Sequence, residues 1–223
     1  MSAYNINKNT NLINLMIENE KKANEKYFEN NPDSLIILFE RELKELGYEF
    51  EVTSQILGFM PQHKKVIVPI AIKYYQLAKK DSKDDEQKHF LDYFHFKGIE
   101  EVVPMLIDDF CSVEVNDSIK WSIADCLYQI RSKKFVKNYL DIISSAQYGK
   151  NRQMVILLVG KLKIEDSIPI LIELLEDEEV RLHAICALGD FKRKEFRVYF
   201  ERFVNDKHPG WRKYAKAALK KIS

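Results

Sequence analysis

The sequence predicts an all-α fold, a right-handed α-α superhelix or α-solenoid of about five or six antiparallel helix pairs. Two observations give the helical class: the 223 residues include only 7 Gly and 6 Pro, and apolar residues recur at helical spacing along almost the whole chain, with no convincing alternating strand. A third gives the superhelix, because similar helical segments recur at intervals of 32, 29 and 31 residues. Such a period indicates stacked repeats.

The chain is expected to begin with an irregular helical cap over residues 1–60, followed by repeats over residues 61–223, forming one continuous solenoid domain. The first repeat is the least regular. We expect its two helices over Val66–Lys79 and Glu86–Phe96, joined by a loop rich in acidic residues and lysines. The acidic run Asp81–Glu86 is interpreted as solvated.

The first helix of three repeats is recognised by a proline near its start. The motif is Val-Pro or Ile-Pro followed by apolar residues, and its prolines are Pro69, Pro104 and Pro169. Proline is well tolerated in the first turn of a helix, because the N–H that it lacks has no partner there. Each of these motifs therefore predicts a helix start.

The second helix of four repeats is aligned on a basic residue, which we call the anchor. The anchors are Lys120, Arg152, Arg181 and Arg212, and apolar side chains follow each of them at +3, +6 and +7. These three positions lie on one face of a helix and predict its buried side. Gly160 and Gly189 stand at equivalent positions, both at +8, and are expected to end their helices as C-caps.

The segment Ser167–Asp190 resembles the HEAT repeat, in the short bacterial form also called the phycobilin-lyase HEAT-like repeat. The resemblance is strongest over residues 165–223 and weakest before residue 98. It implies a ladder of acidic and basic residues between successive turns, interrupted at the copy that has Ala146 in the acidic position. The implied ladder consists of Glu114, Lys120, Arg152, Asp177, Arg181, Asp206 and Arg212.

The second helices of such a stack line its concave side, so their non-core positions +1, +2 and +5 are candidates for binding a partner. These positions mix aromatic, aliphatic and polar side chains, a composition that suits protein recognition. Packing against the next repeat is the alternative for the aliphatic members. The candidate groove residues are Trp121, Ser122, Asp125, Gln153, Met154, Leu157, Leu182, His183, Cys186, Lys213, Tyr214 and Ala217, with Lys88, His89 and Asp92 from the weak first copy.

Charge is balanced overall but not along the chain. The net charge of +1 combines −7 over the first 130 residues with +8 over the last 43. The basic end predicts contact with an acidic protein surface or, less favoured, with nucleic acid; a solubilising terminal face is the simpler alternative. The predicted basic C-terminal patch comprises Arg193, Lys194, Arg197, Arg202, Arg212, Lys216 and Lys220.

Catalytic and metal-binding motifs are not apparent, and we expect no enzyme activity, no metal and no cofactor. His183 and Cys186 could form a Cys-His dyad, but no third group orients them, so a structural role is favoured. Trp121 and Asp125 stand four residues apart, as a DNA glycosylase of HEAT-like fold would require. A basic lining is missing around this pair, which makes the glycosylase the weaker alternative.

Taken together, the sequence predicts a non-catalytic scaffold, adaptor or inhibitor that holds another protein in its concave groove. A toxin-neutralising immunity protein is one form of this hypothesis. The chain shows neither a secretory signal pattern nor a membrane-spanning apolar stretch, so a cytoplasmic location is expected. The oligomeric state and the identity of the partner do not follow from the sequence.

Overall fold

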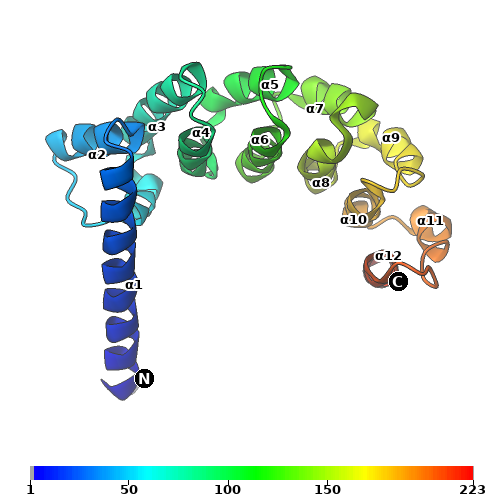
Figure 1. The fold of residues 1–223 in the computed structure, drawn as a ribbon. Coiled ribbons are helices and arrows are strands. Elements are labelled where there is room, and N and C mark those ends of the chain that lie inside the picture. Colours follow the sequence, from blue (N-terminus) through cyan, green and yellow to red (C-terminus); the bar gives the residue numbers. More distant parts are fainter. Residues whose placement is uncertain (1–2, 223) are drawn as a thin grey trace. The chain divides into compact units, whose positions relative to one another are not determined.

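The structure, a computed structural model, describes residues 3–222 and is all-helical over this range. Twelve α-helices and five short 3-10 helices follow one another, and the described residues contain no strand (Figure 1). The predicted fold class, an all-α solenoid, is confirmed.

The chain divides into two compact units, residues 1–93 and residues 94–223. The expected boundary after residue 60 falls inside a helix, α3 (Ser54–Lys80). The arrangement of the cap and the repeats as one continuous solenoid stays a prediction.

The first unit contains α1 (Ala3–Asn30), α2 (Leu35–Glu45), α3 and α4 (Asp84–Leu91). Its core is aromatic: the fully buried ring of Phe39 on α2 contacts the rings of Tyr74 on α3 and Phe90 on α4, with centroids 5.7 and 5.4 Å apart. These edge-on contacts favour one arrangement of the three helices over other packings.

The predicted helix start at Val66, with Pro69 in the first turn, is wrong. Helix α3 begins at Ser54 and contains both Pro61 and Pro69 in its interior. An internal proline costs a helix about 3 kcal/mol in an exposed setting. Here apolar residues on both sides of the prolines, including Met60 and Val68, are fully buried, and their packing outweighs that cost.

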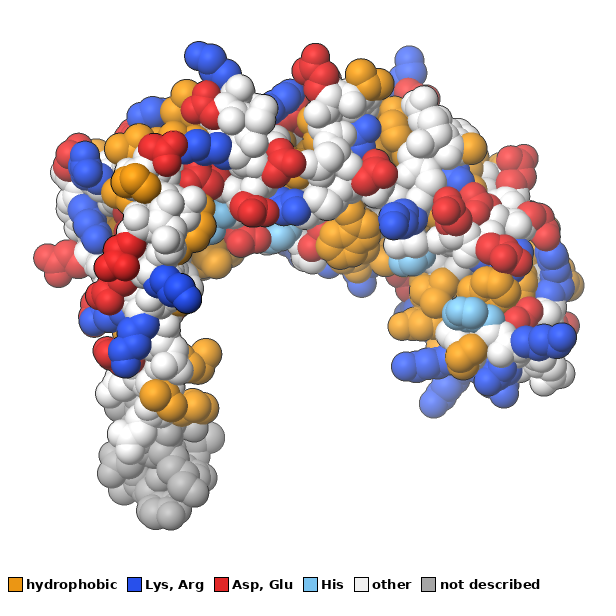
Figure 2. Space-filling model, in the orientation of Figure 1, with side chains coloured by type: hydrophobic (Ala, Val, Ile, Leu, Met, Phe, Trp, Pro, Cys, Tyr) orange, Lys and Arg blue, Asp and Glu red, His pale blue; other side chains and the backbone are white. Residues whose placement is uncertain are grey.

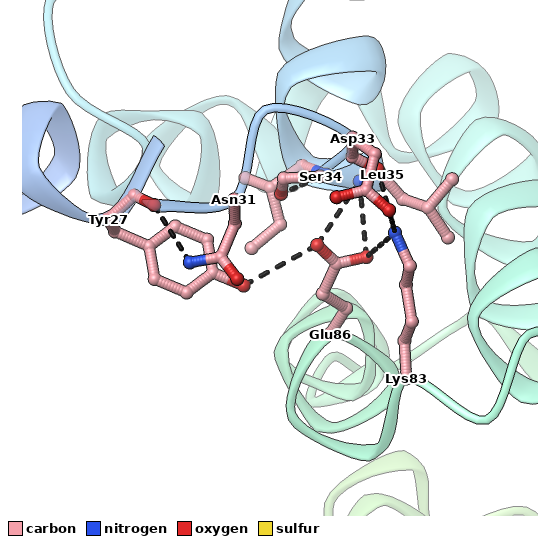
Figure 3. A network of polar contacts seen from close by, with 8 residues as sticks. Tyr27, Asn31, Asp33, Ser34, Leu35, Lys83 and Glu86 are labelled. Atoms are coloured by element: carbon pink, nitrogen blue, oxygen red, sulfur yellow. Dashed lines mark hydrogen bonds and ion pairs between the residues drawn. The ribbon is translucent and has the colours of Figure 1, made fainter. Parts of the chain in front are cut away.

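The prediction that the acidic run Asp81–Glu86 is solvated is wrong for Glu86, which is only 4% exposed. Its carboxylate accepts hydrogen bonds from the backbone N–H of Leu35, at 3.1 and 3.2 Å, and from the hydroxyl of Tyr27 at 3.4 Å (Figure 3). Lys83 lies 4.0 Å from the same carboxylate and donates to the backbone carbonyl and the carboxylate of Asp33. One acidic side chain on α4 thereby joins α1 to the start of α2.

The second unit consists of four helix pairs in two layers. Helices α6, α8, α10 and α12 pack side by side as the inner layer, and α5, α7, α9 and α11 form the outer layer (Figure 1). With α3 and α4 of the first unit, five pairs are present, in agreement with the prediction. The pairs of the second unit are α5 (Val103–Cys111) with α6 (Asp117–Ile130), α7 (Val136–Ser144) with α8 (Gln153–Leu162), α9 (Ile168–Glu173) with α10 (Arg181–Phe191), and α11 (Arg197–Glu201) with α12 (Pro209–Lys221).

The proline and anchor patterns correctly located most of these helices. Pro104 and Pro169 lie in the first turns of α5 and α9. Side chains at +3, +6 and +7 from the anchors are buried on α6, α8 and α10, and on α12 the residues at +3 and +6 are buried whereas Leu219 is half-buried. The hydrophobic core of the second unit therefore follows the predicted register.

The two repeat glycines do not end helices, which corrects their predicted role. The C-caps of α8 and α10 are instead Lys163 and Lys192, in the left-handed conformation with φ of 54° and 57°. Gly160 faces the backbone of Ala187 on the next inner helix, where a Cβ atom would lie 2.5 Å from the Ala187 Cα. Gly160 is required by the close approach of α8 and α10.

Candidate functional site

The candidate site is the inner face, which we define as positions +1, +2 and +5 of α6, α8, α10 and α12. Trp121 and Tyr214 are its most exposed large apolar residues, with 43% and 38% of their surfaces accessible. Figure 2 shows hydrophobic side chains exposed beside Lys and Arg on the inner side of this unit. The other members, all half-buried or exposed, are Ser122, Asp125, Gln153, Met154, Leu157, Leu182, His183, Cys186, Lys213 and Ala217.

Polar contacts fix part of this face. The amide Nε2 of Gln153 on α8 donates to the backbone carbonyl of Glu179, before α10, at 2.7 Å. The carboxylate of Asp125 lies 3.6 Å from Nε2 of His95 and accepts from Gln129 at 3.4 Å. Asp125 therefore stands among polar side chains, and no Lys or Arg of the described residues forms an ion pair with it.

Burial disfavours the reactive charged forms of His183 and Cys186. Burial raises the pKa of the Cys186 thiol to about 11 and lowers the pKa of His183. The thiol is therefore protonated and the imidazole neutral near pH 7, whereas a nucleophilic cysteine needs the thiolate. Among the described residues, no three His, Cys, Asp or Glu side chains are grouped so that they could hold a metal ion.

Arg152 links successive repeats, although the resemblance implied an interrupted ladder there. The side chain is only 3% exposed. It donates to the carbonyls of Ile143, at 2.7 Å, and Gly149, at 3.3 Å, and pairs with Asp177 of the following repeat. The acidic partner comes from the next turn, so the Ala146 substitution does not break the connection.

The other ladder residues bond differently from the implied pattern. Arg181 donates to the backbone carbonyls of Leu175 and Glu176 and lies over the ring of Trp211, 4.2 Å from its centroid. Arg212 donates to the carbonyls of Asp206 and Lys207, not to the Asp206 carboxylate. Within the described residues, exposed Glu114 makes no ion pair with Lys120, and Asp117 accepts from Asn151 of the next repeat instead, at 2.8 Å.

The basic C-terminal patch is less positive than its composition suggests. Arg193 and Arg202 pair with Glu165 and Glu176 of the preceding repeat, and Arg197 pairs with Glu201. The guanidinium of Arg212 is bound to backbone carbonyls. Among the described residues of the patch, the lysines Lys194, Lys216 and Lys220 are exposed and form no ion pair, and the last two lie on α12.

A cavity in the first unit was not predicted. It has a volume of about 410 Å³ and lies between α1, the start of α3, and α4. Two of its lining residues, His89 and Asp92, are the +2 and +5 positions of the weak first repeat. The remaining walls come from residues such as Tyr27 on α1, and no sequence pattern pairs residues so far apart in the chain.

Comparison with protein-family models finds a match to HEAT repeats over residues 136–220. The matched segment runs from α7 almost to the end of α12. The search of curated proteins finds no match. Within residues 3–222, no helix combines the length and the apolar composition needed to cross a bilayer. The part of the second unit that covers residues 136–220 is therefore similar to HEAT repeats.

Proposed function

We propose that the protein is a non-catalytic scaffold that binds another protein on the inner face of α6, α8, α10 and α12. The observation that carries this proposal is the row of accessible apolar and aromatic side chains across adjacent helices, with Trp121 and Tyr214 the most exposed. Tryptophan and tyrosine dominate the binding energy of protein interfaces. HEAT repeats commonly mediate contacts between proteins.

The packing of the inner layer supports a binding role. The glycine at +8 of α8 and the buried Arg152 hold neighbouring repeats in close, specific contact. A surface that is already ordered loses little conformational entropy when a partner binds. The inner face is therefore suited to a folded protein that matches its shape.

The exposed lysines of α12 define the chemistry of one end of this interface. Lys213 and Lys216 lie exposed beside Tyr214, so the matching part of the partner carries acidic side chains. An adaptor, a regulator or an inhibitor fits this description, including an immunity protein that masks a toxin in the cytoplasm. We also assign the repeats to the short, phycobilin-lyase-like form within this proposal, without its lyase activity.

Affinity capture under native conditions tests the proposal, with Trp121→Ala/Tyr214→Ala as the disrupted variant. Both residues are exposed, so their removal should leave the fold intact. Val198→Ala is the matched control, since Val198 is 61% exposed on the outer helix α11. A stoichiometric protein retained by the wild type and the control, but lost with the double variant, is the expected result.

Two outcomes would contradict this function. Capture of nucleic acid alone, with binding that weakens steeply as salt rises, would favour the nucleic-acid alternative. Excision of alkylated bases, abolished by Asp125→Asn, would establish a glycosylase-like enzyme instead.

A further inference from the structure

The cavity of the first unit has the size and walls of a small-ligand site. Its volume of about 410 Å³ lies within the range of about 300 to 1,000 Å³ that is usual for such sites. Aromatic surfaces dominate one part of the wall: the rings of Tyr27 and Phe28 on α1, and those of His89 and Tyr93 from α4 and the turn after it. Tyr27 and Phe28 are half-buried, whereas Tyr93 is only 1% exposed and packs against Phe39, with ring centroids 4.9 Å apart.

The charged groups of the lining all have the same sign. Glu20, Asp85 and Asp92 contribute carboxylates, and no Lys or Arg belongs to the described lining. His89 does not supply a positive charge near neutral pH, because its burial lowers the pKa of the imidazole. The described lining of the cavity therefore combines aromatic residues with carboxylates and contains no basic side chain that is charged near neutral pH.

Local hydrogen bonds hold the polar part of the wall in place. The Glu20 carboxylate accepts from the backbone N–H of Ser54 at 2.9 Å and from its hydroxyl at 2.6 Å. Asn24 donates to the Thr53 hydroxyl at 3.2 Å. These contacts join α1 to the start of α3, so that both sides of the cavity are fixed before a ligand enters.

We propose that this cavity binds an organic cation, an alkylammonium or guanidinium group whose apolar stem lies against the aromatic rings. The faces of aromatic rings attract cations, most strongly where water is excluded, and the carboxylates supply the opposing charge. An anion would be repelled by the same carboxylates. The proposal is independent of the protein-binding role of α6 to α12.

An organic cation could reach this cavity from two sources: as a Lys or Arg side chain of a protein segment, or as a free small-molecule amine or guanidine. Nα-acetyl-arginine methylamide represents the first source, and n-butylguanidine, which lacks the peptide groups, represents the second. Titration calorimetry with the full chain measures both. Tenfold tighter binding of the capped arginine would indicate a protein segment, and equal or tighter binding of butylguanidine would indicate a free small-molecule cation.

The decisive comparison replaces the cation without changing the shape of the ligand. Nα-acetyl-citrulline methylamide has a neutral urea in place of the guanidinium, and we expect it to bind at least about tenfold more weakly than the arginine compound. Amide chemical shifts should change for residues 20–28 and 85–93 when the arginine compound is added. The absence of saturable binding by either cation up to about 10 mM, or equal binding of the arginine and citrulline compounds, would overturn the proposal.

Variants locate the site. Asp85→Asn/Asp92→Asn removes two exposed carboxylates of the lining, and we expect about tenfold weaker binding of the arginine compound. Asp108→Asn/Asp141→Asn is the matched control, because it removes the same charge from exposed positions of α5 and α7. Equal weakening by the two variants would show a response to net charge alone and would refute a specific site. Circular dichroism confirms that each variant is folded.

Discussion

Gly160 of α8 approaches Ala187 of α10 so closely that a methyl group on Gly160 would lie 2.5 Å from the Ala187 Cα and 2.8 Å from its carbonyl oxygen. The neighbouring atoms belong to the backbone, which cannot move aside as a flexible side chain can. Gly189 stands in the same relation to Ala218 on α12, although its added methyl would lie 3.1 Å from the Ala218 Cβ. At both contacts, a glycine on one inner helix faces an alanine on the next, and this pairing allows the two helices to pack closely.

Gly160→Ala is therefore expected to destabilise the second unit. Overpacking costs about 1–3 kcal/mol, and the better helix propensity of alanine returns only about 1 kcal/mol. Gly189→Ala should cost less. Gly58→Ala is the control, because Gly58 is exposed on α3 with no atom within 4 Å of a Cβ, and we expect it to stabilise the protein. Urea unfolding curves measure all three, and a stabilising Gly160→Ala would disprove the close approach.

The buried Arg152 gives a second prediction. Arg152→Met should destabilise the protein by about 3–5 kcal/mol, because it leaves two carbonyls and the Asp177 carboxylate without their donor. Asp177→Asn should cost less, and the double variant should cost less than the sum of the two. Lys120→Met at the equivalent anchor of α6 is the control with a small expected effect. Additive costs in this double-mutant cycle, measured by denaturant unfolding, would contradict the ion pair.

Glu86 gives a third prediction, for the first unit. Glu86→Ala should destabilise the protein by about 1–3 kcal/mol, because the buried N–H of Leu35 loses its acceptor. Glu86→Gln should cost less, since an amide oxygen can still accept although the favourable charge at the start of α2 is lost. Unfolding curves followed by circular dichroism provide the measurement. Equal stability of Glu86→Ala and the wild type would show that the carboxylate does not hold α2.

Two half-buried histidines make stability depend on pH. Burial lowers the pKa of both His89 and His183 from the ordinary value of 6.5, although Glu86 and Asp92 oppose the shift at His89. The unfolded chain therefore binds protons that the folded protein does not, and stability falls as the pH drops below about 6.5, by at most about 1.4 kcal/mol per pH unit for each group.

The comparison of wild type with His89→Gln/His183→Gln tests this dependence. Denaturant midpoints recorded between pH 7.5 and 5.5 should fall with acidification in the wild type and change less in the variant. Identical slopes for the two proteins would mean that the histidines titrate equally in the folded and unfolded chains.

Sequence periodicity predicted the second unit well, because the inner helices bury side chains at the same positions relative to their anchors. The apolar residues at +3, +6 and +7 distinguish core from surface within a single helix, so no distant contact is needed to interpret them. The same register correctly placed Trp121 and Tyr214 among accessible side chains. Their binding role remains a prediction, because exposure alone does not identify a partner.

Features that depend on contacts between distant residues were predicted poorly. The glycine at 160 was interpreted as a helix end because its neighbour on α10 cannot be inferred from local sequence. Pro69 was interpreted as a helix start because local propensity does not include the packing of α3. The cavity beside Tyr93 escaped prediction since its opposite wall, at Tyr27, lies on α1.

Lys220 occupies on α12 the +8 position that Gly160 and Gly189 occupy on α8 and α10, and it is exposed. A helix that packed against α12 as α10 packs against α8 would therefore meet a long charged side chain at the position where Gly160 allows close backbone contact. Lys220 thus disfavours the close glycine-to-alanine spacing at this position. Grafting an additional repeat onto α12 by design would first require Lys220→Gly.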